Sequence, residues 1–190
     1  MYKYLYLTHP EWASAWVSGG KIPLNPASAY KKMDREGIYT PDENLIYEST
    51  HDLESFGHLI KVDGVRDLKI GKIVENGRTI AENVRASKYH EDGVILSLCN
   101  RKSKEIAKKL NKKACVKILD VDVLKKVIDD QLGKVSIAKC CEYTASYNRN
   151  HFLKSTEDEW QDEFRLFWDH QERIEVTLPK GIARRIKLNL

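Results

Sequence analysis

The residues most suited to chemistry are Gln161 and Glu163, which open the segment 159–168 (EWQDEFRLFW) near the end of the chain. The change from polar to apolar residues predicts a strand that enters a buried sheet from its rim. Residues two apart in a strand project from the same face, so we expect the Gln161 amide and the Glu163 carboxylate side by side in a cleft. A carboxylate fixed there can stabilise a cationic sugar as its glycosidic bond breaks. A polar strand start followed by core aromatic residues would show the same pattern.

A second polar pair, Thr8 and His9, ends the first expected strand, residues 2–8 (YKYLYLT). Pro and Glu follow, which suit the first turn of a helix over roughly 10–17. Thr8 or His9 is expected to cap this helix, and two glycines then end it before a short extended piece.

The best candidate for a central strand is 93–100, where Ser97 interrupts an apolar run. The next segment, 101–113, holds seven basic residues and one acid on an expected helix whose inner face carries Ile106 and Leu110. Such a density of cations suits contacts with the phosphates of a nucleic acid, and a solvated helix face is the alternative. The candidate contacts are Lys104, Lys108, Lys109 and Lys112. A second basic patch lies at 179–187.

Taken in chain order, Thr8-His9, the Gly-Gly helix stop, Ser97 and Gln161-x-Glu163 resemble the mono-ADP-ribosyltransferases, in particular toxins that modify DNA or RNA. The resemblance implies that NAD is the substrate and that Glu163 grips the ribose hydroxyls while nicotinamide leaves. It implies that Gln161 addresses the acceptor and that Thr8 and His9 bond the nicotinamide ribose or amide. Ser97 would match a serine that supports the NAD site, although leucines flank it here in place of hydroxyl residues.

The segment 25–44 is rich in turn residues, with one helix expected from 28 to about 36. In the resembled family this region folds over NAD. An aromatic side chain there stacks on nicotinamide and an arginine meets the pyrophosphate, which makes Tyr30, Arg35 and Tyr39 the candidates.

The fold class predicted from these elements is α+β, with short strands in split antiparallel sheets and a few flanking helices, as the ADP-ribosyltransferase resemblance implies. Residues 1–190 are expected to form one domain. Within it, 46–92 is an insertion or a target-recognition elaboration with a hairpin turn at 75–78 (ENGR). Later elements are a strand over 114–119, a helix from Asp120 or Asp122 to Gln131, and strands over 134–143 and 174–178. The inner face of that helix is expected to carry Val123, Leu124, Val127 and Ile128.

Composition and the absence of common motifs exclude several classes of function. No run approaches the roughly 20 apolar residues of a membrane span. The four cysteines fit no zinc spacing, so we expect reduced thiols in a cytoplasmic protein and no metal site. The glycine-rich dinucleotide fingerprint, the phosphate-binding loop and the common zinc-protease and hydrolase motifs are all missing. An NAD site of the resembled kind needs no glycine fingerprint, because a sheet cleft holds the cofactor.

The sequence therefore predicts an NAD-dependent ADP-ribosyltransferase toxin that modifies a nucleic acid, RNA or DNA, in phage defence, with an antitoxin protein as a candidate partner. Three alternatives stay open. They are a transferase that acts on protein, a non-enzymatic basic nucleic-acid-binding protein, and a nuclease. The nuclease would use as metal ligands Glu157, Asp158, Glu159 and Asp162.

Overall fold

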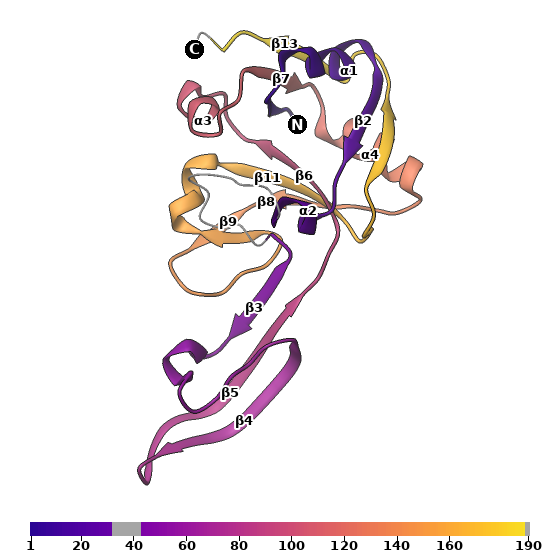
Figure 1. The fold of residues 1–190 in the computed structure, drawn as a ribbon. Coiled ribbons are helices and arrows are strands. Elements are labelled where there is room, and N and C mark those ends of the chain that lie inside the picture. The colour runs from indigo at the N-terminus through magenta and orange to yellow at the C-terminus, as the bar shows by residue number, and fades with distance from the viewer. Residues whose placement is uncertain (32–42, 189–190) are drawn as a thin grey trace.

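The computed structural model describes residues 1–31 and 43–188. These residues form an α+β protein with mostly antiparallel sheets and few helices, as predicted (Figure 1). The largest sheet has the strand order β13-β7-β1-β6-β11-β8. Its strands are β1 (Lys3–Leu7), β6 (Val94–Cys99), β7 (Ala114–Ile118), β8 (Ile137–Cys140), β11 (Glu163–Trp168) and β13 (Ala183–Ile186). The strands β1, β6 and β11 are thus direct neighbours. The predicted NAD contacts outside 25–44 lie on these strands or directly after them.

One face of this sheet forms the main hydrophobic core. It packs against α1 (Ala13–Ser18), α4 (Val121–Leu132) and the two-stranded sheet of β2 (Gly20–Leu24) and β12 (Ile174–Leu178). In α4, Asp120 caps the N-terminus and Gly133 ends the helix in a left-handed conformation. The predicted inner position of Val123 is wrong, since that side chain is 50% exposed. The buried stripe begins instead at Val121 and continues through Leu124 and Ile128.

The opposite face of the sheet carries both polar and apolar side chains. It carries Ser97 on β6 and Glu163 and Arg165 on β11, because Ser97 pairs with Arg165 in the ladder and Glu163 with Cys99. Near β1 and β7 this face is covered by α3 (Lys104–Lys109). Near β11 it is covered by the segment of β9 (Glu142–Thr144), β10 (Leu153–Ser155) and the 3-10 helix η3 (Thr156–Gln161), as Figure 1 shows.

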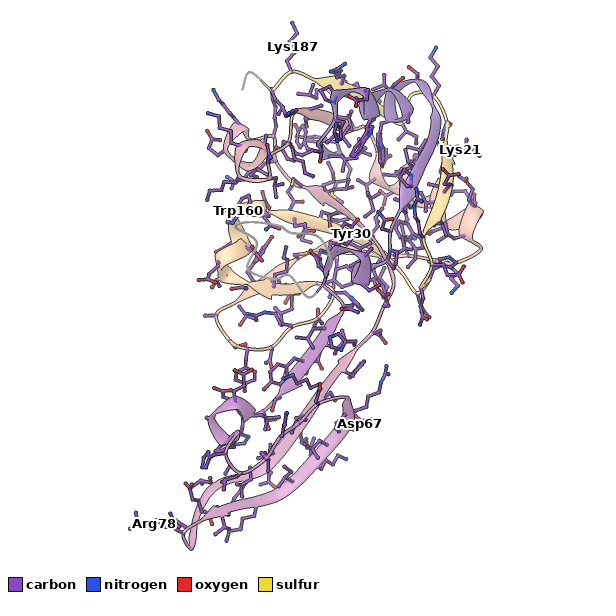
Figure 2. The ribbon with its side chains drawn as sticks, viewed as in Figure 1. Lys21, Tyr30, Asp67, Arg78, Trp160 and Lys187 are labelled. Atoms are coloured by element: carbon purple, nitrogen blue, oxygen red, sulfur yellow. The ribbon has the colours of Figure 1, made fainter. Side chains whose placement is uncertain are left out.

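The span expected as an elaboration holds a separate three-stranded sheet, with the order β3-β5-β4, that projects from the main body (Figure 1). Its strands are β3 (Leu45–Ser49), β4 (Val65–Glu75) and β5 (Arg78–His90), and the short helix η2 (Leu53–Phe56) lies beside them. The predicted hairpin is confirmed, with positive φ at Asn76 and Gly77 in the turn. Arg78 lies at the far tip of this arm (Figure 2). The arm has its own apolar cluster around Tyr47 and Val84.

Several predicted boundaries change in the structure. The helix after β1 starts as a 3-10 turn, η1 (Pro10–Trp12), before α1 begins. The helix expected at 28–36 is α2 (Ala27–Lys31), and the remainder lies outside the described residues. The single strand expected over 134–143 is two strands, β8 and β9, which part at the buried Cys141 and pair with different partners.

Among the residues that the structure describes, no helix is both long and apolar enough to cross a membrane.

Candidate active site at Glu163

The segment before Glu163 is helical, so Gln161 and Glu163 do not share one extended strand as predicted. The 3-10 helix η3 ends at Gln161, and Asp162 turns the chain in a left-handed conformation with φ 48°. Helix formation here has a local cause: the Ser155 side chain accepts a hydrogen bond from the Glu157 backbone N–H, and acidic residues occupy the first turn. The alternation argument therefore fails between 161 and 163.

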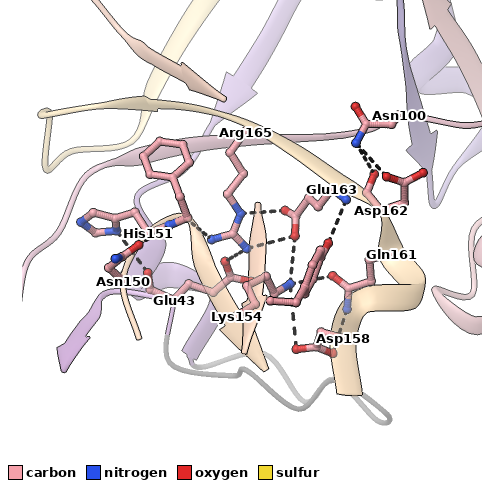
Figure 3. Close-up of polar contacts among 12 residues, drawn as sticks. Glu43, Asn100, Asn150, His151, Lys154, Asp158, Gln161, Asp162, Glu163 and Arg165 are labelled. Atoms are coloured by element: carbon pink, nitrogen blue, oxygen red, sulfur yellow. Dashed lines mark hydrogen bonds and ion pairs between the residues drawn. The ribbon is translucent and has the colours of Figure 1, made fainter. Parts of the chain in front are cut away.

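The Glu163 carboxylate lies in a closed network of charges and not in an open cleft, which corrects the second part of that prediction (Figure 3). Arg165 holds it with two hydrogen bonds, from Nε to Oε1 at 2.8 Å and from a terminal nitrogen to Oε2 at 3.2 Å. Lys154 Nζ donates to Oε2 at 2.9 Å. Glu163 is only 5% exposed, Arg165 2% and Lys154 1%.

The electrostatics of this trio favour the ionised carboxylate. Burial by itself raises the pKa of Glu163, but Arg165 and Lys154 lower it by more, so its pKa lies well below the usual value. Burial by itself lowers the pKa of Arg165, but Glu163 and Glu43 raise it by more, so its pKa lies well above the usual value. Glu163 therefore carries a fixed negative charge at neutral pH.

Gln161 still reaches this network, although by another route than the one predicted. Its Oε1 accepts a hydrogen bond from Lys154 Nζ at 2.6 Å, and its Nε2 donates to Asp158 Oδ1 at 3.0 Å. Lys154 Nζ also lies 4.0 Å from the other oxygen of Asp158. Both ends of the Gln161 amide are thus engaged inside the protein.

On its other side, Arg165 is fixed by two further groups. It forms an ion pair with Glu43 and donates to the backbone carbonyl of His151 at 2.7 Å. Burial lowers the pKa of His151 below its usual value of 6.5, against opposing contributions from the Glu43 carbonyl and the Glu91 carboxylate. The His151 ring is therefore neutral at pH 7, and it stacks on Phe167 with ring centroids 4.0 Å apart.

The formal charges of the network do not cancel. Three carboxylates, those of Glu43, Asp158 and Glu163, surround the two cations Arg165 and Lys154. One net negative charge therefore remains in a region that is almost completely buried. A buried charge interacts more strongly with a nearby ligand charge than an exposed one does, because water screens it less.

Ser97 is the predicted cofactor residue that the fold brings to Glu163. Its hydroxyl lowers the pKa of the Glu163 carboxyl, and Ser97 itself is exposed. It thus links the buried network to the surface of the sheet.

Thr8 and His9 lie further away on the same sheet. Tyr4 is level with Cys99 and Glu163 in the strand ladder, and Thr8 follows Tyr4 by four residues, or roughly 13 Å along the strand. The Thr8 hydroxyl accepts a hydrogen bond from Lys112 Nζ at 2.8 Å. His9 occupies the helix cap position but makes no side-chain cap bond, and it lies beside Glu11 at 3.6 Å.

The other predicted residues are scattered. Tyr30 lies half-buried in α2, whereas Arg35 and Tyr39 fall outside the described residues. Lys104, Lys108 and Lys109 are exposed on α3, but the helix ends at Lys109, so the prediction that Lys112 belongs to it is wrong. The Lys109 ammonium lies over the Trp160 ring, 4.8 Å from its centroid.

A shallow cavity of about 540 Å³ adjoins the network. Its lining residues are Arg101, Tyr143, Thr156, Glu159, Trp160 and Asp162. It is tied to the site because the Tyr143 hydroxyl accepts a hydrogen bond from the Glu163 backbone N–H at 2.9 Å. Arg101 lies 3.4 Å from Asp162 at this cavity and could meet an anionic group of a ligand.

The acids of the nuclease alternative do not converge. Asp158 is buried in the network, whereas Glu157 and Glu159 are exposed. Within residues 1–31 and 43–188, no group of three or more His, Cys, Asp or Glu side chains is arranged to hold a metal ion.

Glu43, Lys154 and Arg165 were not predicted as members of the site, and Asp158 was predicted only as a metal ligand. One signal was available: Arg165 lies in an apolar run two residues after Glu163, and a charged residue in a buried strand needs a partner. No comparable sequence signal identifies Glu43 or Lys154, which belong to other segments of the chain.

Comparison with known proteins identifies no relative: no protein-family model, no curated protein and no solved structure matches this chain.

Proposed function

We propose that this protein is an NAD-dependent ADP-ribosyltransferase that transfers ADP-ribose to a nucleic acid, RNA or DNA, and that the polar face of β6 and β11 holds the reacting ribose. One observation carries the proposal. The exposed Ser97 neighbours a buried carboxylate, Glu163, whose pKa its hydroxyl lowers, in a network that retains one net negative charge. The resemblance to the ADP-ribosyltransferases implies a role for the same two residues in binding NAD.

The chemistry suits such a network. When the bond between ribose and nicotinamide breaks, positive charge develops on the sugar, and nicotinamide leaves as a neutral molecule. A fixed negative charge nearby stabilises this state more than the ground state, provided that it does not have to reorganise. Arg165 meets this condition, since its two hydrogen bonds hold both oxygens of the Glu163 carboxylate and keep it ionised and in one orientation.

Substrate access would occur through Ser97. The two oxygens of a carboxylate offer about four acceptor positions. Arg165 uses two and Lys154 one, which leaves about one. Ser97 is the exposed residue beside Glu163, so a ribose hydroxyl that approaches over Ser97 can take this position. Thr8 and His9 stay predicted NAD contacts further along this face.

The test is NAD binding, measured as the rise in melting temperature with NAD, together with nicotinamide release in the presence of cellular RNA or DNA. Ser97→Ala should bind NAD, because the smaller side chain does not obstruct the approach to Glu163. Ser97→Phe should not bind it, because a ring would fill the approach to Glu163. Ser55→Phe, at an exposed serine on the arm, is the matched control and should bind like the wild type. If NAD neither shifts the melting temperature nor yields nicotinamide, the proposal is wrong.

A second candidate function is nucleic-acid binding without NAD chemistry. It is favoured by a different interpretation of the same network: Arg165 and Lys154 already hold the buried Glu163 carboxylate with three hydrogen bonds, as in a purely structural ion-pair cluster. Tight nucleic-acid binding with no nicotinamide release would select it. A role as a toxin in phage defence, with an antitoxin partner, belongs to the first candidate alone, and expression in cells that tolerate only the Glu163→Gln form would support it.

A further inference from the structure

Two basic segments that are far apart in the sequence dominate the charge of this protein. Residues 101–113 and 184–187 hold ten of the 32 lysines and arginines but one of the 28 acidic residues. They contribute +9 to a formal net charge of +4, so the rest of the chain is net −5. The protein is thus only locally basic.

The fold brings the two segments together. β13 pairs with β7, and Lys113 leads directly into β7 from the end of the first basic segment. Ile106 and Ala107 of α3 pack in one cluster with Leu188, which follows β13. Both segments lie at the end of the molecule opposite the arm, where Lys187 is labelled (Figures 1 and 2). A shallow cavity of about 560 Å³ joins them, and its charged lining residues are Lys113, Arg185 and Lys187.

Most of these cations form no ion pair. Among the residues that the structure describes, eight of the ten form no ion pair with a carboxylate: Lys102, Lys104, Lys108, Lys109, Lys113, Arg184, Arg185 and Lys187. Some exposed lysines elsewhere on the protein are paired. Lys21 lies 3.9 Å from Glu175, and Lys126 lies 3.0 Å from Asp130. Unpaired cations gathered on one surface are typical of proteins that bind a polyanion.

An exposed aromatic ring lies beside the second segment. Tyr2 is 51% exposed, and the ammonium of Lys117 lies 3.5 Å from its ring centroid. Lys117 in turn pairs with Arg184 in the β7–β13 ladder. Aromatic rings among cations bind single-stranded nucleic acids, because an unpaired base can stack on the ring while the phosphates meet the cations.

We propose that the α3–β13 surface, defined as Lys104, Lys108, Lys113, Arg185, Lys187 and Tyr2, binds a single-stranded nucleic acid along its phosphate backbone. This inference rests on the proposed function in one respect only: the bound nucleic acid is taken to be the target of the transferase. Its test needs no NAD, so either can fail without the other.

The experiment measures binding of the full-length protein to a fluorescein-labelled 20-nucleotide single strand of mixed sequence, by fluorescence anisotropy over a series of salt concentrations. Three double variants each remove two positive charges: Lys104→Gln/Lys108→Gln on α3, Arg185→Gln/Lys187→Gln on and just after β13, and Lys21→Gln/Lys126→Gln as the control. Melting curves confirm that each variant is folded. RNA and DNA strands are compared with the corresponding duplexes.

Each lost phosphate contact reduces the slope of log K against log salt by about 0.7 for a single strand. Both test variants should therefore reduce the slope by about 1.4, which is about a 25-fold loss of affinity at 0.1 M salt. A quadruple variant that combines the Lys104/Lys108 and Arg185/Lys187 substitutions should reduce the slope by about twice as much if the two segments form one surface. Tyr2→Ala should weaken binding at least about 5-fold with an unchanged slope, because stacking releases no ions.

Three results would overturn the inference. One is an Arg185/Lys187 variant that binds like the Lys21/Lys126 control, since β13 would then take no part. Another is tighter binding to the duplex than to the single strand. The third is no binding of any nucleic acid at low salt, which would leave an acidic protein as the partner of this surface.

Discussion

The substitution Glu163→Gln separates the two roles that the charge network can have, catalytic and structural. The amide keeps the shape of the side chain and one acceptor oxygen but removes the negative charge. If Glu163 stabilises a cationic sugar, the rate of nicotinamide release should fall on the order of 100- to 1000-fold. NAD affinity should change far less, because the ground-state sugar carries no charge.

The structure adds a cost to folding. Breaking one partner out of a buried ion pair typically costs about 3–5 kcal/mol, and the retained acceptor oxygen places Glu163→Gln near the lower value. For a chain of this length, about 3 kcal/mol corresponds to a fall of roughly 6–12 °C in melting temperature. Calorimetry measures this fall, and activity must then be assayed well below the melting points of all variants.

The control is Lys154→Met, which disturbs the same network from its other side. It removes the Lys154 ammonium, which donates a hydrogen bond to the Glu163 carboxylate at 2.9 Å. This loss should lower the melting temperature by a similar amount. The carboxylate and its Arg165 partner remain, so activity should stay within about 10-fold of the wild type. Equal losses of activity in the two folded variants would refute the catalytic role of Glu163 and leave the network as a structural element.

Two further predictions concern the stability of the fold around the site. Because burial keeps the pKa of His151 below 6.5, the unfolded chain binds more protons than the native one below that pH, so the melting temperature should fall as the pH drops below 6.5. His151→Gln should make this dependence shallower, and an identical slope in the variant would show that another group controls it. Gly93→Ala should destabilise the protein by about 2–3 kcal/mol in chemical denaturation. Its new Cβ would lie 2.4 Å from the Phe167 ring and 2.6 Å from the Trp168 carbonyl oxygen. Gly71→Ala, whose Cβ meets nothing within 4 Å, is its control, and an equal effect of the two would contradict the packing argument.

Much of the fold followed from local patterns in the sequence. The apolar runs of β6 and β11, the Asp120 cap and Gly133 stop of α4, and the Asn76-Gly77 turn each have a cause within a few residues. Such signals need no knowledge of the rest of the chain, which is why the α+β class could be predicted.

The candidate site could be predicted only in part, because it depends on contacts between distant segments. Glu163 was found from its own neighbourhood, but Lys154 reaches it from β10 and Glu43 meets Arg165 from the segment before β3. The alternation rule also failed where it mattered, since η3 replaces the strand that was expected through Gln161. Capping by Ser155 and the acidic first turn are local signals for that helix that the hydrophobic pattern outweighed.

The most direct test of the central claim, that the Glu163 network promotes ADP-ribosyl transfer, is the fate of NAD labelled in its adenylate phosphate. The wild type and the Lys154→Met and Glu163→Gln variants are incubated with labelled NAD and total cellular RNA, DNA and protein, and each pool is then separated by nuclease or protease digestion. We predict that label enters a nuclease-sensitive pool with the wild type and Lys154→Met, together with an equal amount of free nicotinamide, and not with Glu163→Gln. No label in any pool and no nicotinamide from the folded wild-type protein would contradict the account.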